Sequence, residues 1–154
     1  MNDPLIGDIC TYDSLIGDIT SLKLEEIVNG NFQLIDRGEP GLSAGDVFLF
    51  QTQLIDPDTK EFVATKNAIE QYSQGENGDI ISIIHEAIEF SDGSKLYTGG
   101  TFNQTQRPDT LNLTIIYGTG AFEGAKGNEE IKSVSPFIPG DDQVDSIITL
   151  TFIG

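Results

Sequence analysis

The chain has 154 residues, of which 25 are acidic, eight basic and one histidine, so its formal net charge is −17. A surface this acidic excludes nucleic acid and anionic membranes as partners, because both need basic side chains. The single cysteine, Cys10, excludes a disulfide scaffold and a cysteine-based zinc site. No apolar run reaches the ~18 residues of a membrane span, and no signal peptide is visible. We therefore expect one cytoplasmic domain.

Residues 1–20 contain a short repeat, Leu-Ile-Gly-Asp-Ile, at 5–9 and again at 15–19. Two copies are too few for a stacked-repeat fold, which needs about three or more units. We expect a hydrophobic arm over 1–20 that packs on the rest of the chain or on a neighbouring subunit. The domain itself then spans residues 21–154.

From residue 21 onward, β-branched and aromatic residues alternate with turn signals, a pattern typical of strands. Asp92-Gly93, between two extended runs, is the strongest hairpin signal. No segment shows helical periodicity beyond a single turn around 121–126. The predicted strands are 21–28, 47–55, 62–72, 80–90, 94–103, 110–117, 128–134 and 144–153. Strands this short and evenly spaced predict an all-β barrel or sandwich.

Residues 118–127, Gly-Thr-Gly-Ala-Phe-Glu-Gly-Ala-Lys-Gly, form a glycine-rich corner. A phosphate-binding loop would need Ser or Thr after its lysine and a helix behind it, but Gly127 and Asn128 follow Lys126. A dinucleotide-binding fingerprint would need a βαβ unit. We therefore expect no cofactor here, and a tight backbone corner in which glycine adopts positive φ.

This corner resembles the one shared by allene oxide cyclases and plant dirigent proteins. Upstream, residues 44–50, Ala-Gly-Asp-Val-Phe-Leu-Phe, resemble the Gly-Asp-x-x-x-Phe stretch of allene oxide cyclases, and Val63-Ala64-Thr65 resembles their Ile-Gly-x strand. Residues 86–99 resemble the corresponding hairpin of bacterial spirotetronate cyclases. The similarity covers about residues 22–135. It implies an eight-stranded antiparallel β-barrel, closed at one end and wide enough for one small ligand.

The resemblance also orients the strands. It places Phe50 in the cavity, Glu70 at the family's cavity cysteine and Glu26 near the family's catalytic glutamate. Side chains two residues apart share a face of a strand, which extends each assignment along its strand. We therefore predict three catalytic carboxyl groups, Glu26, Glu70 and Glu86. The predicted substrate-binding residues are Leu24, Phe48, Phe50, Thr52, Ser82, Ile84, Ile88, Phe90 and Thr101.

A carboxylate in an apolar cavity loses hydration, which raises its pKa, and neighbouring carboxylates raise one another's pKa further. Such a group can act as general acid or base. The chain has no nucleophile elbow and no second His or Cys for a transition-metal site. We therefore predict a cyclase without metal or cofactor, which folds a flexible, largely apolar polyketide, polyene or oxylipin for intramolecular cyclisation.

Three alternatives stay open. A one-residue slip would turn the glutamates outward and His85 inward. The barrel could be a dirigent-like or carrier module that binds a small apolar ligand without catalysis. It could also be a structural barrel filled by its own side chains. The resemblance further implies a homodimer or homotrimer, because allene oxide cyclases and dirigent proteins are trimers and spirotetronate cyclases are dimers.

Overall fold

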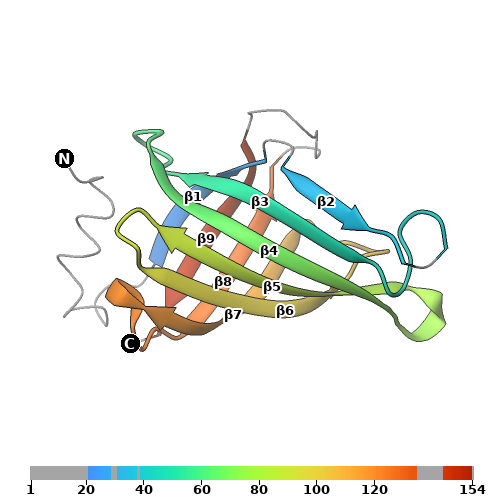
Figure 1. The fold of residues 1–154 in the computed structure, drawn as a ribbon. Coiled ribbons are helices and arrows are strands. Elements are labelled where there is room, and N and C mark those ends of the chain that lie inside the picture. Colours follow the sequence, from blue (N-terminus) through green and yellow to red (C-terminus); the bar gives the residue numbers. More distant parts are fainter. Residues whose placement is uncertain (1–20, 29–30, 38, 135–143, 154) are drawn as a thin grey trace.

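The computed structural model describes residues 21–28, 31–37, 39–134 and 144–153, so the arm predicted over residues 1–20 lies outside the described residues. The fold is all-β, as predicted. Eight antiparallel strands close into a barrel, because β1 (Ser21–Ile27) pairs with both β9 (Val144–Phe152) and β3 (Val47–Ile55) (Figure 1).

Going round the barrel from β1 and β9, the order continues through β8, β7, β6, β5 and β4 to β3. The bounds of these strands are β4 Phe62–Gln74, β5 Ile80–Phe90, β6 Lys95–Asn103, β7 Thr110–Thr119 and β8 Gly127–Ser133. Each predicted strand is confirmed to within two residues. Two short 3-10 helices, η2 (Glu76–Gly78) and η3 (Gly120–Phe122), lie between β4 and β5 and between β7 and β8.

One strand was not predicted: β2 (Phe32–Ile35). It pairs with Val47–Phe50 of β3, whereas β1 pairs with Gln53–Ile55 of the same strand. Hence β1 and β2 lie end to end along β3, as one wall strand interrupted between them. Among the described residues β2 pairs with β3 alone, so it forms a short wall at one end of the barrel.

The strand register decides which side chains face inward. On β5, Ile84 and Glu86 are buried while His85 is exposed, so the one-residue slip is wrong. The prediction for Thr101 is also wrong, because Thr101 pairs with Ile83 on the outer face and is exposed. The turn at 91–94 has an even number of residues, which keeps the even-numbered residues of β5 and β6 on the same inner face.

The glycine-rich corner closes one end of the barrel, at the left in Figure 1. There the ring of Phe122 packs against Phe90 and Phe152, with centroids 4.6 and 5.8 Å away. Gly127 has φ +146°, and a Cβ there would lie 1.8 Å from the carbonyl oxygen of Thr151. The corner therefore needs glycine for close backbone approach, as predicted.

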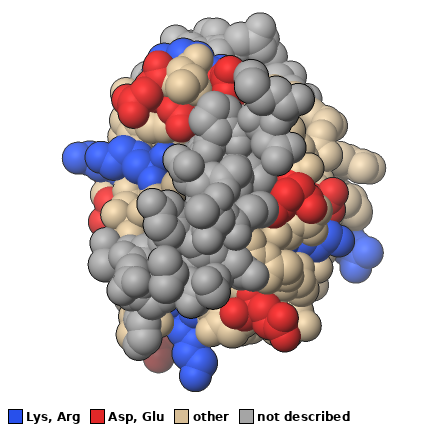
Figure 2. Space-filling view, turned by 90° about the vertical axis from the view of Figure 1, so that its left-hand side faces the viewer, with Lys and Arg blue, Asp and Glu red and all other residues tan. Residues whose placement is uncertain are grey.

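Figure 2 shows the molecule from this end, and both acidic and basic side chains lie on the described part of the surface in view. No helix within the described ranges is long and apolar enough to cross a membrane.

Candidate functional site

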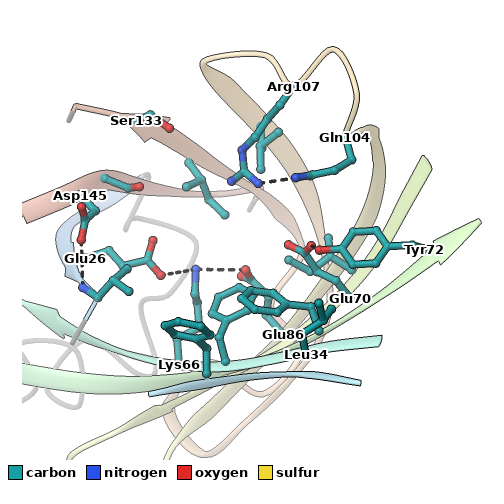
Figure 3. A pocket seen from close by; sticks show the side chains of 18 of the residues that line it. Glu26, Leu34, Lys66, Glu70, Tyr72, Glu86, Gln104, Arg107, Ser133 and Asp145 are labelled. Atoms are coloured by element: carbon teal, nitrogen blue, oxygen red, sulfur yellow. Dashed lines mark hydrogen bonds and ion pairs between the residues drawn. The ribbon is translucent and has the colours of Figure 1, made fainter. Parts of the chain in front are cut away.

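The opposite end of the barrel holds an open cavity of about 540 Å³ (Figure 3). This volume lies within the range of small-molecule sites, ~300–1,000 Å³. The apolar part of its wall consists of Val28, Phe32, Leu34, Leu42, Phe48, Phe50, Ile84, Leu111 and Ile131. Its polar part consists of Glu26, Lys66, Glu70, Tyr72, Glu86, Gln104, Arg107, Ser133, Asp145 and Ser146. The cavity thus combines an apolar wall with polar side chains that face the same space.

Six of the predicted site residues line this cavity: Glu26, Glu70, Glu86, Phe48, Phe50 and Ile84. Leu24, Ile88 and Phe90 face inward but belong to the packed core of the closed half. Thr52 and Ser82 are buried without lining the cavity, and Thr101 lies outside the barrel. The predicted set of substrate-binding residues therefore extends too far toward the closed end, where the chain's own aromatic rings fill the interior of the barrel.

Lys66 forms the centre of the cavity floor, and we did not predict it. Its side chain is only 2% exposed, and its Nζ lies 2.5 Å from Glu26 Oε2 and 3.1 Å from Glu86 Oε2. Thr52 donates a second hydrogen bond to Glu26 Oε2, at 2.7 Å. Burial lowers the pKa of Lys66, but the nearby carboxylates more than reverse this and raise it above its ordinary value. The lysine therefore stays charged.

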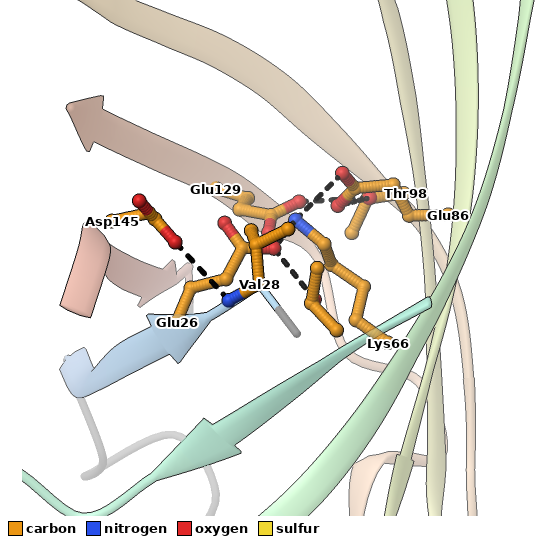
Figure 4. Close-up of polar contacts among 8 residues, drawn as sticks. Glu26, Val28, Lys66, Glu86, Thr98, Glu129 and Asp145 are labelled. Carbon is orange, nitrogen blue, oxygen red and sulfur yellow. Dashed lines mark hydrogen bonds and ion pairs between the residues drawn. The ribbon is translucent and has the colours of Figure 1, made fainter. Parts of the chain in front are cut away.

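A third carboxyl group, Glu129, lies behind the cavity wall on β8 (Figure 4). It is completely buried, and its Oε1 lies 2.8 Å from the hydroxyl of Thr98. The same hydroxyl lies 3.2 Å from Glu86 Oε1. Burial, and then the charge of Glu86, raise the pKa of Glu129 well above its ordinary value, while Lys66 opposes the shift. Its surroundings therefore favour the protonated form of Glu129.

Glu70 and Tyr72 form a second polar group, nearer the mouth (Figure 3). The phenol of Tyr72 donates a hydrogen bond of 2.7 Å to Glu70 Oε2. Burial raises the pKa of Glu70, although this hydrogen bond and the charge of Arg107 oppose the shift. Burial, together with Glu70, also raises the pKa of Tyr72. A carboxyl group whose pKa is raised in this way is suited to exchange protons with a bound molecule.

Arg107 stands at the rim of the cavity. It is exposed, its guanidinium lies 5.1 Å from the centre of the Phe102 ring, and its Nη1 donates to Gln104 Oε1 at 3.4 Å. Arg107 thus places a positive charge beside the cavity mouth.

The Gly45-Asp46 motif has a structural role at the mouth. The buried carboxylate of Asp46 accepts hydrogen bonds from the backbone N–H groups of Arg37 and Ser43, each at 2.8 Å. The backbone of Asp46 also bonds to Tyr72, at 3.0 Å. Asp46 therefore anchors the loop before β3 next to the Glu70–Tyr72 pair.

In the described ranges, no three His, Cys, Asp or Glu side chains form a group that could hold a metal ion.

A family model described as an allene oxide cyclase barrel like domain matches residues 26–149. No curated protein matches the sequence. Among solved structures, pyocyanin demethylase has a TM-score of 0.68 at 18% identity, over 86% of this chain and 98% of its own. A pterocarpan synthase dirigent protein has a TM-score of 0.64 at 23% identity, over 88% of this chain and 96% of its own. The Diels–Alderase AbmU from Streptomyces koyangensis has a TM-score of 0.68 at 17% identity, over 97% of this chain and 77% of its own. At these identities the likeness shows a shared fold.

Proposed function

The chain belongs to the family of allene oxide cyclase-like barrel domains, and we propose that it is a cyclase. In this proposal the open cavity binds one flexible, largely apolar molecule and folds it for intramolecular cyclisation. The observation that carries the proposal is the cavity itself, whose apolar wall surrounds the Glu70–Tyr72 pair and the Lys66 floor. A structural relative described as a Diels–Alderase supports it, since that protein has the same kind of barrel.

The physical basis is preorganisation. Holding two reacting ends of one molecule in a productive geometry can supply ~7–11 kcal/mol of the activation barrier. Phe48, Phe50 and Ile84 would set the curvature of the bound chain through apolar contact. We propose that the substrate is a polyene, oxylipin or polyketide, and that the reaction needs no cofactor.

We propose a separate role for each polar group. Glu70 would exchange a proton with the substrate, because burial raises its pKa above the ordinary value of a carboxyl group. Tyr72 would position Glu70 through their hydrogen bond. Arg107 at the rim would stabilise negative charge on an oxygen-bearing end of the substrate. On the floor, Lys66 holds Glu26 and Glu86 in place.

The test is turnover of a synthetic linear polyene that carries a conjugated diene and an α,β-unsaturated ketone. Cyclised products are separated by chiral chromatography and identified by mass spectrometry. We expect the wild type to accelerate cyclisation and to favour one stereoisomer. Glu70→Gln should slow it by ~10²–10⁴-fold, the usual contribution of general acid–base catalysis. The control is Thr101→Ala on the outer face, which should turn over like the wild type.

Unchanged turnover in Glu70→Gln would remove Glu70 from the mechanism. If the wild type binds the polyene but changes neither rate nor isomer ratio, the cyclase proposal is wrong and the barrel is a carrier. If it changes the isomer ratio without the rate, the barrel is dirigent-like.

We also propose that the chain forms a homodimer or homotrimer through the outer face of β5, β6 and β7. Ile116 and Tyr117 are each 59% exposed there, and the rings of Tyr117 and Tyr97 lie 5.8 Å apart. Chains of net charge −17 repel one another, so self-association favours a surface with few acidic side chains. On the outer face of these three strands the acidic side chain is Glu89, which forms an ion pair with Lys95 at 3.4 Å. Light scattering after gel filtration should show an oligomer that Ile116→Asp converts to monomer. A wild-type monomer would contradict this.

A further inference from the structure

The hydroxyl of Thr98 lies between two carboxyl groups inside the barrel. Its Oγ1 is 2.8 Å from Glu129 Oε1 and 3.2 Å from Glu86 Oε1 (Figure 4). A hydroxyl group has one hydrogen to donate and two lone pairs that accept. It can therefore donate to one of the two carboxyl groups while it accepts a hydrogen bond from the other. A carboxyl group that donates a hydrogen bond carries a proton.

The surroundings decide which carboxyl group holds this proton. Glu86 forms an ion pair with Lys66 at 3.1 Å, so its carboxylate has a cation as direct partner. Glu129 is 0% exposed, and its cross-strand neighbours are Leu113 on β7 and Leu150 on β9. The charged groups that act on Glu129 are Glu86 on β5, which disfavours its ionisation, and Lys66 on β4, which favours it. The balance places the proton on Glu129.

The two carboxyl groups also differ in their access to the cavity. Glu86 lines the cavity, whereas Glu129 does not. Thr98 is 1% exposed, and its hydroxyl is within hydrogen-bond reach of both groups. A proton on Glu129 therefore has a hydrogen-bonded path to the cavity, which passes through Thr98 and then Glu86.

We propose that Glu129, Thr98 and Glu86 form a proton relay that stores one proton behind the cavity wall and supplies it to the cavity. Delivery to a substrate rests on the proposed cyclase function, whereas storage does not. In the delivery step, Glu86 becomes protonated as Thr98 passes its hydrogen to Glu86 and takes the hydrogen of Glu129. Glu86 then donates this proton to a carbonyl oxygen of the bound molecule. After the ring has closed, the protonated carbonyl returns this proton to Glu86 and back along the same path, so no net proton is consumed.

The test of storage is infrared spectroscopy of the ligand-free full chain at pH 7, in which a protonated carboxyl group has a carbonyl band distinct from that of carboxylates. Because burial also raises the pKa of Glu70, the comparison is made in the Glu70→Gln background. We expect the band to persist in Glu70→Gln and to be lost in the double variant Glu70→Gln/Glu129→Gln. A band that survives in the double variant, or no band in Glu70→Gln, overturns the proposal.

The test of the path is the rate at which this band shifts after transfer to D₂O. Thr98→Val keeps the shape of the side chain but removes the hydroxyl, so we expect exchange several-fold slower than in the wild type. Thr98→Ser keeps the hydroxyl and should exchange like the wild type. Equal exchange in Thr98→Val and wild type overturns the relay. Neither measurement needs a substrate, so failure of the relay is distinguishable from failure of the cyclase function.

Discussion

Replacing Lys66 by Met tests whether the floor of the cavity is a buried charge cluster held together by one cation. The side chain of Lys66 is 2% exposed, and those of its partners Glu26 and Glu86 are 5% and 0% exposed. Methionine has similar length, so the variant removes the charge with little change in volume. The carboxylates of Glu26 and Glu86 would then remain buried without their counter-charge.

Breaking a buried ion pair by removing one partner typically costs ~3–5 kcal/mol. Lys66 serves two such pairs, so we expect Lys66→Met to lower the free energy of unfolding by at least about this amount. A domain is usually stable by only ~5–15 kcal/mol, so the variant should be close to unfolding at neutral pH. The matched control is Glu129→Gln, which replaces a protonated carboxyl group by a neutral amide and should cost much less.

The assay is urea denaturation at pH 7, followed by circular dichroism of the β-sheet because the chain has no tryptophan. A second variant separates charge from packing. When Lys66→Met is combined with Glu26→Gln and Glu86→Gln, no unpaired charge remains, and we expect much of the lost stability to return. A loss below about 1 kcal/mol in Lys66→Met, the level of an exposed ion pair, would refute the buried cluster.

Three further predictions follow from single contacts. Because the pKa of Glu129 is raised, the folded chain holds a proton there that the unfolded chain has released above about pH 4.5. The contribution of Glu129 to the free energy of unfolding should therefore fall by ~1.4 kcal/mol per pH unit as pH rises toward the folded pKa. Urea titrations of Glu129→Gln should lack this slope, and a slope identical to that of the wild type would contradict the prediction. Tyr72→Phe removes the hydrogen-bond donor to Glu70, so the pKa of Glu70 should rise. The pH–rate profile for polyene turnover should then move to higher pH. An unmoved profile would show that this hydrogen bond does not lower the pKa of Glu70. Gly127→Ala should lower the melting temperature far more than Gly124→Ala, because a Cβ at Gly127 meets a carbonyl oxygen at 1.8 Å while Gly124 has open space; equal melting temperatures would argue against the tight corner.

The strands could be predicted because this chain carries strong local signals. Residues 80–90 are almost continuously apolar or alternating, and Asp92-Gly93 sets the hairpin that follows. By contrast, β2 has four residues and depends on pairing with β3, a contact between residues distant in sequence. The error at Thr101 came from counting across the turn, since one residue reverses the face of a whole strand.

The site was predictable on the strands that the resemblance oriented, and not beyond them. Lys66 and Tyr72 share the inner face of β4 with Glu70, and the two-residue period alone could have identified both. Lys66 was missed because lysine is rarely buried without a partner, and its partners, Glu26 and Glu86, come from β1 and β5. Glu129 precedes Glu130, and only the register of β8 determines which of the two faces inward.

The claim that the open half of the barrel is a binding site for a flexible apolar molecule can be tested with cis-parinaric acid, a fluorescent 18-carbon polyene. Leu34 and Gln33 are neighbours on β2, but only Leu34 lines the cavity. We predict saturable binding of one molecule per wild-type chain, unchanged in Gln33→Asp and at least about tenfold weaker in Leu34→Asp, a difference of ~1.4 kcal/mol. Equal affinity in the two variants, or no saturable binding by the wild type, would contradict the account.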